Sequence, residues 1–176
     1  MIDEVILVDE NDRETGTMEK MRAHRKGALH RAVSVFIFNG AGELLLQQRA
    51  AGKYHSPGKW SNTCCSHPRP GETELAAARR RLNEEMGMDC ELIKWCELLY
   101  RAEFDNGLTE NEFDHIFLGV TNRLPVINPQ EVATYQYMAV EALETAIRQN
   151  PERFTHWLPL CLEQIELKKK QNETGA

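Results

Sequence analysis

The sequence predicts a single α/β (α+β) domain in which mostly hairpin-connected strands pack against helices. Three observations support this prediction: short β-rich runs separated by turn residues, one alanine-rich amphipathic segment, and further helical segments near the C-terminus. The 176 residues match the size of one domain, and the 41% share of apolar residues is enough for a core. No internal repeat or linker divides the chain, so we expect residues 1–176 to form one domain.

The expected strands come mostly in pairs. Residues 32–38 (AVSVFIF) and 44–49 (LLLQQR) flank the turn NGAGE and predict a β-hairpin. Residues 90–104 and 110–122 flank the turn DNG and predict a second hairpin. Residues 131–140 (EVATYQYMAV) predict one more strand.

Three segments are typical of helices. Residues 72–87 (ETELAAARRRLNEEMG) are rich in alanine, have acids in the first turn and end at Gly87, a natural stop. The apolar positions that fall on one face of this helix are Leu75, Ala78, Leu82 and Met86. Residues 141–150 predict a second helix, and residues 153–170 a third that is interrupted near Pro159.

Charge and hydropathy exclude several classes of protein. The net charge of −6 argues against a partner that is nucleic acid or an anionic membrane, so an anionic ligand requires a local basic pocket. No apolar run approaches the roughly 20 residues of a membrane-spanning helix. The acidic start MIDEVILVDENDRETG lacks the basic region of a signal peptide, and we therefore expect a cytoplasmic protein.

The five cysteines are odd in number and include no C-x-x-C pair, which argues against a disulfide framework or a thiolate zinc site. We expect Cys90, Cys96 and Cys161 to be small buried hydrophobes. The adjacent Cys64 and Cys65 in WSNTCCSHPRPGE have three explanations: a metal clip, a strained disulfide or a reactive nucleophile.

Carboxylates and histidines offer a possible metal site. Glu110 and Glu112 are two residues apart in a predicted strand, so both project from one face of a sheet. His24, His30 and His67 lie in polar or turn-rich settings, where each one alone is more typical of a surface histidine. Together the five would suit Mn²⁺, Zn²⁺ or Fe²⁺ rather than Ca²⁺. Their spacing does not show that they converge.

The predicted helix carries a longer pattern. From Ser66 the sequence reads S-x5-E-x7-R-R-L-x-E-E-x-G-M, which resembles the Nudix box G-x5-E-x7-R-E-U-x-E-E-x-G-U, where U is apolar. Ser66 replaces the first glycine. Arg81 replaces the first glutamate of R-E-U, an acid that binds metal in Nudix hydrolases, and a cation there could instead hold a diphosphate.

Other motifs narrow the resemblance. NTCCSHP, the altered Nudix box, YRA (100–102), ENE (110–112) and FTHW (154–157) follow one another in this order. The chain is thereby identified as similar to the type 1 isopentenyl diphosphate isomerases, which have a Nudix fold with mixed or antiparallel sheets flanked by helices. The resemblance runs from TGTMEK near the start to Trp157.

The resemblance implies two metal sites. A transition-metal site for Mn²⁺ or Zn²⁺ maps onto His24, His30, His67, Glu110 and Glu112, so residues 1–31 contribute ligands. A Mg²⁺ site maps onto the backbone carbonyl of Cys65 and the side chain of Glu85, with the substrate diphosphate completing the coordination shell.

The resemblance also implies the catalytic and substrate-binding residues. Cys65 and Glu112 are the proton-transfer groups, Tyr100 hydrogen-bonds Glu112, Trp157 lines the pocket, and Cys64 is a buried neighbour. The diphosphate grip maps onto Lys20, Arg49, Lys53 and Arg81. Two further departures concern the pocket rim: Ser56 stands where a large aromatic residue is commoner, and His156 where proline is commoner.

The implied reaction converts isopentenyl diphosphate to dimethylallyl diphosphate through a tertiary carbocation. A Nudix hydrolase acting on a nucleoside diphosphate derivative is one alternative, against which Arg81 and the cysteine motif argue. A non-catalytic metal- or nucleotide-binding module is another, but a binder needs no free thiol beside a metal site. The C-terminal helices (141–176) allow either a monomer or a homodimer.

Overall fold

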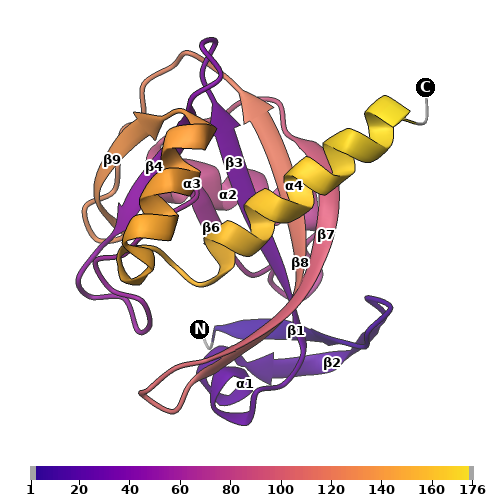
Figure 1. The fold of residues 1–176 in the computed structure, drawn as a ribbon. Coiled ribbons are helices and arrows are strands. Elements are labelled where there is room, and N and C mark those ends of the chain that lie inside the picture. Colours follow the sequence, from indigo (N-terminus) through magenta and orange to yellow (C-terminus); the bar gives the residue numbers. More distant parts are fainter. Residues whose placement is uncertain (1–2, 175–176) are drawn as a thin grey trace.

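The computed structural model describes residues 3–174, which form one mixed nine-stranded sheet with helices on both faces (Figure 1). The predicted fold class is therefore confirmed. The strands are β1 (Glu4–Val8), β2 (Glu14–Glu19), β3 (His30–Phe38), β4 (Leu44–Arg49), β5 (Trp60–Ser61), β6 (Cys64–Ser66), β7 (Ile93–Glu103), β8 (Thr109–Val120) and β9 (Val132–Met138). The helices are α1 (Lys20–Lys26), α2 (Glu74–Met86), α3 (Val140–Gln149) and α4 (Trp157–Thr174), with a 3₁₀ turn at Pro151–Arg153.

Strand β3 is the centre of the sheet. It runs parallel to β8 over its whole length, from the pair His30/Glu112 to the pair Phe38/Val120. Its other edge pairs antiparallel with β6, where Ser34 lies opposite Cys65. This topology places residues 64–66 and 109–120 directly beside residues 30–38.

Alternation along β3 divides the core into two layers. Val33, Val35 and Ile37 point to the side that α2 covers, together with its buried Leu82. Phe36 points to the opposite side, where α3 and α4 lie across the sheet (Figure 1). Both faces of β3 are therefore buried, which explains why residues 32–38 read as a continuous apolar run.

The predicted hairpins are confirmed with one difference. The hairpin of β7 and β8 forms around the DNG turn, where Gly107 adopts a φ of 77°. The turn between β3 and β4 also forms, but these strands share only the pair Phe38/Leu44. Most of β3 pairs instead with β8 and β6, which lie far away in the sequence.

Two details of the predicted helices are wrong. Leu75 was expected on the buried face of α2, but it is 41% exposed because it lies in the first turn, beyond the packed part of the helix. The interruption expected at Pro159 does not occur. Helix α4 begins at Trp157, so Pro159 lies in the first turn, where a missing N–H group costs no intrahelical hydrogen bond.

The sequence patterns did not predict the N-terminal hairpin of β1 and β2 or the short helix α1. A polar cluster attaches this hairpin to the sheet: Arg31 donates to Asp12 at 2.7 Å and lies 3.3 Å from Glu74 of α2. The buried His115 lies 3.0 Å from the Asp12 carboxylate. These contacts lie on the sheet face opposite to Glu112, because Arg31 and His115 alternate with His30 and Glu112.

All five cysteines are free, so the disulfide explanation of the CC pair does not hold. Cys161 is buried as expected, whereas Cys90 and Cys96 are only half-buried, because their elements lie at the edge of the core. Among residues 3–174, no helix has both the length and the apolar character that a bilayer crossing requires.

Candidate active site

Tyr100 and the two glutamates of ENE face the same way from the β7–β8 hairpin. Tyr100 is the register partner of Glu112, and alternation puts both carboxyl groups on one face. The Tyr100 hydroxyl lies 3.0 Å from Glu110 Oε2 and 2.7 Å from Glu112 Oε2. One hydroxyl group thus holds one oxygen of each buried carboxyl group and leaves both Oε1 atoms for other partners.

The two carboxyl groups differ in their preferred charge. Burial and the neighbouring Glu112 raise the pKa of Glu110 well above its usual range. Burial opposes the ionisation of Glu112 too, but contacts with His30 and His67 outweigh it and hold the pKa of Glu112 well below its usual range. A second positive group would be needed before both carboxyl groups ionise together.

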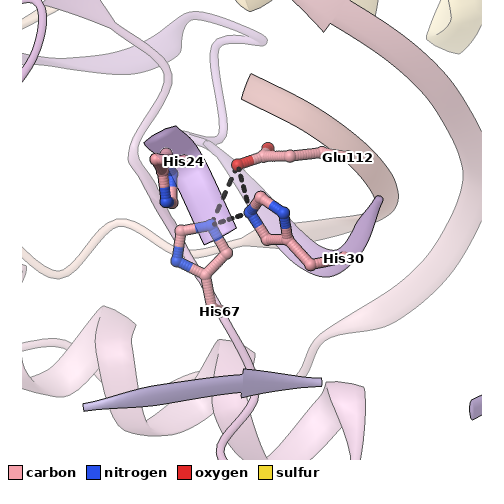
Figure 2. Close-up of side chains that lie close together, drawn as sticks. All are labelled: His24, His30, His67 and Glu112. Atoms are coloured by element: carbon pink, nitrogen blue, oxygen red, sulfur yellow. Dashed lines mark hydrogen bonds and ion pairs between the residues drawn. The ribbon is translucent and has the colours of Figure 1, made fainter. Parts of the chain in front are cut away.

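Three histidines converge on Glu112 (Figure 2). His24 comes from α1, His30 from the start of β3, and His67 from the segment after β6. His67 Nε2 lies 2.9 Å from Glu112 Oε1 and 3.2 Å from His30 Nε2, which lies 3.5 Å from the same oxygen. The surface position expected for each histidine alone is wrong, because the fold encloses His24 and His30 completely.

The hydrogen bonds of these histidine rings leave nitrogen lone pairs that can bind a cation. His24 Nδ1 lies 2.8 Å from the Lys20 carbonyl, and His30 Nδ1 lies 2.8 Å from the Ala28 carbonyl. Each Nδ1 therefore donates its proton to a backbone carbonyl, and each Nε2 presents a lone pair. Metal-binding histidines typically have this arrangement. Within residues 3–174, His24 Nε2 has no hydrogen-bond partner although it is buried. Burial also lowers the pKa of His67 to about 3.

The four ligand atoms of His24, His30, His67 and Glu112 lie within 4.8 Å of one another, so these residues fit a divalent cation. The fifth expected ligand, Glu110, does not belong to this group. It forms a second group with His24 and a residue that the motifs did not single out, His55. His55 Nε2 lies 3.1 Å from Glu110 Oε1. Burial lowers the pKa of His55 to about 2.

Cys65 lies on β6, and its side chain reaches the same cavity as Glu112. Its sulfur lies 3.9 Å from Arg49 Nη1. Burial raises the pKa of the Cys65 thiol to about 12, so the thiol keeps its proton at neutral pH although Arg49 is near. Cys64 points to the other face of the sheet and packs beneath α2.

Four basic residues line this cavity: Lys20, Arg49, Lys53 and Arg81. Lys53 and Arg81 both pair with Glu131, and Arg81 also lies 2.6 Å from Glu85. Arg49 lies 5.4 Å from the centre of the Trp157 ring. Three separate segments therefore supply the local positive charge that an anionic ligand requires on this acidic protein.

The expected Mg²⁺ ligand Glu85 is buried, and both of its oxygens already accept hydrogen bonds. Arg81 Nη2 donates to Oε1 at 2.6 Å and Gln47 Nε2 donates to Oε2 at 2.7 Å. Glu85 belongs to none of the potential ligand groups found within the described residues. A cation bound to Glu85 would therefore share these oxygens with Arg81 and Gln47.

Trp157 lines the cavity from the start of α4. It is 2% exposed, and its indole nitrogen donates to Asn62 Oδ1 at 3.0 Å. The cavity itself measures about 40 Å³, which holds only about one or two waters. Of the two rim departures, Ser56 adopts a left-handed φ of 48° in the β4–β5 loop, and His156 is exposed.

Comparison with known proteins bears on this site. The NUDIX domain model matches residues 28–158. The chain is 51% identical over 176 residues to isopentenyl-diphosphate Delta-isomerase 2 of Aromatoleum aromaticum, covering 100% of this chain and 93% of that one. It is 55% identical over 162 residues to isopentenyl-diphosphate Delta-isomerase of Pectobacterium atrosepticum, covering 92% and 90%. The chain belongs to the isopentenyl-diphosphate Delta-isomerase family.

The family resemblance drawn from the motifs is therefore confirmed. The fold agrees as well: DR0079 from Deinococcus radiodurans superposes with a TM-score of 0.76 at 20% identity, over 96% of this chain and 98% of that one. The isomerase motifs do not single out His55. Its only sequence signal is the HSPG turn, where a histidine precedes the strained Ser56.

Proposed function

We propose that this protein is an isopentenyl-diphosphate Delta-isomerase, which converts isopentenyl diphosphate to dimethylallyl diphosphate in isoprenoid biosynthesis. The observation that carries the proposal is one cavity lined by a protonated thiol, a carboxylate, an indole ring and several basic side chains. The names of relatives about half identical over nearly the whole chain support the same reaction.

The reaction moves a double bond by protonation at one carbon and deprotonation at another. An unactivated alkene is a weak base, so the reaction needs an acid on one face and a base on the other. We assign these roles to Cys65 and Glu112, which line the cavity together. The division of contacts on Glu112 suits its role: Oε1 faces the histidines, and Oε2 faces the Tyr100 hydroxyl.

The tertiary carbocation needs a wall that stabilises positive charge and excludes water. The Trp157 ring can contribute about 0.5–2 kcal/mol as a cation–π partner. Its burial and the small size of the cavity keep water, which would trap the cation as an alcohol, away from it. The cavity must widen to admit the substrate, because it is far smaller than the several hundred Å³ of an ordinary ligand site.

The diphosphate binds at the basic residues of the cavity. Its negative charge would replace Glu131 as the partner of Lys53 and Arg81, while Lys20 and Arg49 complete the grip. Mg²⁺ would be held beside the diphosphate by Glu85, whose Oε1 keeps a lone pair next to Arg81, and by the Cys65 carbonyl.

We assign the transition-metal site to His24, His30, His67, Glu110 and Glu112, with Mn²⁺ or Zn²⁺ as its ion. Four of these residues form one ligand group, and Glu110 adjoins that group through His24. When bound, these cations supply fixed positive charge, which neutralises the adjacent carboxylates and the substrate diphosphate. Tyr100 holds Glu112 in one orientation through Oε2 in either case.

One assay tests the proposed function. Purified protein with Mg²⁺, Mn²⁺ and isopentenyl diphosphate should form dimethylallyl diphosphate, and in D₂O the product methyl group should contain deuterium. Release of phosphate would identify a hydrolase instead. If the metal-loaded protein forms neither product, it is a binding module and the proposed function is wrong.

A further inference from the structure

His55 is a buried histidine of the β4–β5 loop, and the isomerase motifs give it no role. It is 5% exposed and lines the cavity. Its ring stacks on Phe104 with centroids 5.4 Å apart and meets Trp157 edge-on at 5.6 Å. Arg49 Nη2 donates to the His55 carbonyl at 3.1 Å. Packing and this hydrogen bond therefore fix the ring in one place.

The fixed ring points its Nε2 at a carboxyl group. His55 Nε2 lies 3.1 Å from Glu110 Oε1, and within residues 3–174 the buried His55 Nδ1 has no hydrogen-bond partner. The ligand atoms of His24, His55 and Glu110 lie within 4.8 Å of one another. A buried imidazole whose Nε2 faces a carboxylate oxygen at this distance can share a cation with it, as His67 and Glu112 can in the neighbouring group.

The group containing His55 and the group containing Glu112 cannot each bind their own ion through His24. Lys20 O occupies His24 Nδ1 at 2.8 Å, so His24 has one lone pair to offer, at Nε2. Tyr100 holds Oε2 of both glutamates, which leaves Oε1 of Glu110 facing His55 and Oε1 of Glu112 facing His67. The two groups therefore adjoin at His24, and because their six ligand atoms do not all lie within 4.8 Å of one another, a shared ion must draw the side chains together.

An octahedral site with all six ligands is more compact than the cluster in this structure, but its closest contacts already have the required spacing. With metal–ligand bonds of about 2.1 Å, neighbouring ligand atoms lie about 3 Å apart and opposite ones about 4.2 Å apart. The close contacts of the cluster match the shorter separation: 3.1 Å for His55/Glu110, 3.2 Å for His30/His67 and 2.9 Å for His67/Glu112.

We propose that His55 is a further ligand of the transition metal, so that four histidines and two carboxylates surround a single ion. This inference rests on the transition-metal site of the proposed function and adds one residue to it. Six protein ligands favour an octahedral ion such as Mn²⁺ over tetrahedral Zn²⁺. They also leave no coordination position for water, so this ion would hold Glu110 and Glu112 in place without activating a water molecule.

Counting the water ligands of bound Mn²⁺ tests the proposal. The width of the Mn²⁺ electron paramagnetic resonance lines in water enriched in ¹⁷O reports coordinated water. Wild-type protein should bind one Mn²⁺ per chain and show no broadening. His55→Ala should gain one water ligand and lose at least ~10-fold in Mn²⁺ affinity. His156→Ala, which removes an exposed histidine, should match the wild type in both measurements.

A second variant separates ligation from packing. His55→Phe keeps the ring that stacks on Phe104 but has no nitrogen, so it should keep the thermal stability of the metal-free protein and still lose Mn²⁺ affinity. Water on wild-type Mn²⁺, two ions per chain, or full affinity in His55→Phe would each overturn the proposal. Dimethylallyl formation is measured separately, so a wild type that isomerises while its Mn²⁺ carries water contradicts only the role of His55.

Discussion

Cys64 and Cys65 are adjacent, but β6 sends their side chains to opposite faces of the sheet. Cys64 packs against the α2 side of the core and is 1% exposed, whereas Cys65 lines the cavity with Glu112. Burial raises the pKa of both thiols. Position rather than acidity therefore distinguishes the proposed proton-transfer group from its neighbour.

Replacing each cysteine by alanine should separate these roles. Cys65→Ala should lower kcat by ~10³-fold, within the range for loss of a general acid or base, and keep the bound metal, because the Mg²⁺ contact assigned to Cys65 is a backbone carbonyl. Cys64→Ala should keep most activity and lose about 1 kcal/mol of stability through the small cavity it leaves. Steady-state kinetics and metal analysis measure both effects, and equal loss of activity in the two variants would refute the assignment.

At the scale of single elements, helix α2 contributes to stability through its C-terminal cap and to the cavity through Arg81. Gly87 ends the helix in the left-handed region, with φ at 61°, and its N–H donates to Asn83 O at 2.9 Å. The segment after β8 crosses this end, where Val126 N donates to Met86 O at 2.8 Å. Arg81 projects from the helix into the cavity.

Alanine at Gly87 should be more destabilising than alanine at a glycine in open space. A Cβ at Gly87 would lie 2.5 Å from the Val126 carbonyl oxygen, whereas Gly42, with φ at 78°, has nothing within 4 Å. Gly42→Ala should cost about 1 kcal/mol for the positive φ, and Gly87→Ala a further 1–3 kcal/mol or so for the clash. Thermal unfolding of the two variants compares them. Equal losses would show that the segment after β8 moves freely away.

Arg81→Glu restores the acid of the Nudix box but should not create an efficient hydrolase. It places a new carboxylate beside Glu84, Glu85 and Glu131, which now neutralise Arg81, and it removes a diphosphate-binding cation. KM for isopentenyl diphosphate should rise ~10-fold or more, while phosphate release stays at background. Arg81→Gln, which removes the cation without adding an acid, is the control and should raise KM less. Rapid phosphate release by Arg81→Glu would show that this helix position alone selects the chemistry.

At the scale of the whole molecule, the proposed metal ligands come from four segments that lie far apart in the sequence. His24 lies on α1 beside the N-terminal hairpin, His30 begins β3, His67 follows β6, and Glu112 lies on β8 (Figures 1 and 2). A cation bound by all four would hold the N-terminal segment against the main sheet.

Metal should therefore stabilise the fold. Mn²⁺ at 100 times its Kd should add about 2.7 kcal/mol to the free energy of unfolding, which corresponds to a rise in Tm of about 5–10 °C for a chain of this size. Calorimetry should show one transition for residues 1–176, with the shift reversed by a chelator. His67→Ala should remain folded and lose the shift together with the activity. Full metal occupancy in His67→Ala would contradict the ligand assignment.

The sequence alone determined the fold class, the β7–β8 hairpin, the position of α2 and the family. These features follow from local patterns, namely apolar alternation, turn residues and motif spacing, which a linear sequence contains in full. The joint position of Glu110 and Glu112 also follows from the sequence, because a two-residue spacing fixes one face of a strand.

Only the tertiary structure decided which side chains meet. The parallel pairing of β3 with β8 places His30 beside Glu112, although the two residues are 82 positions apart in the sequence. Burial of the histidines and the role inferred for His55 depend on this long-range packing, since no local sequence pattern marks these histidines as buried. Convergence is a property of the folded chain, because the physical distance between two residues is set by strand pairing and helix packing and not by their separation in sequence.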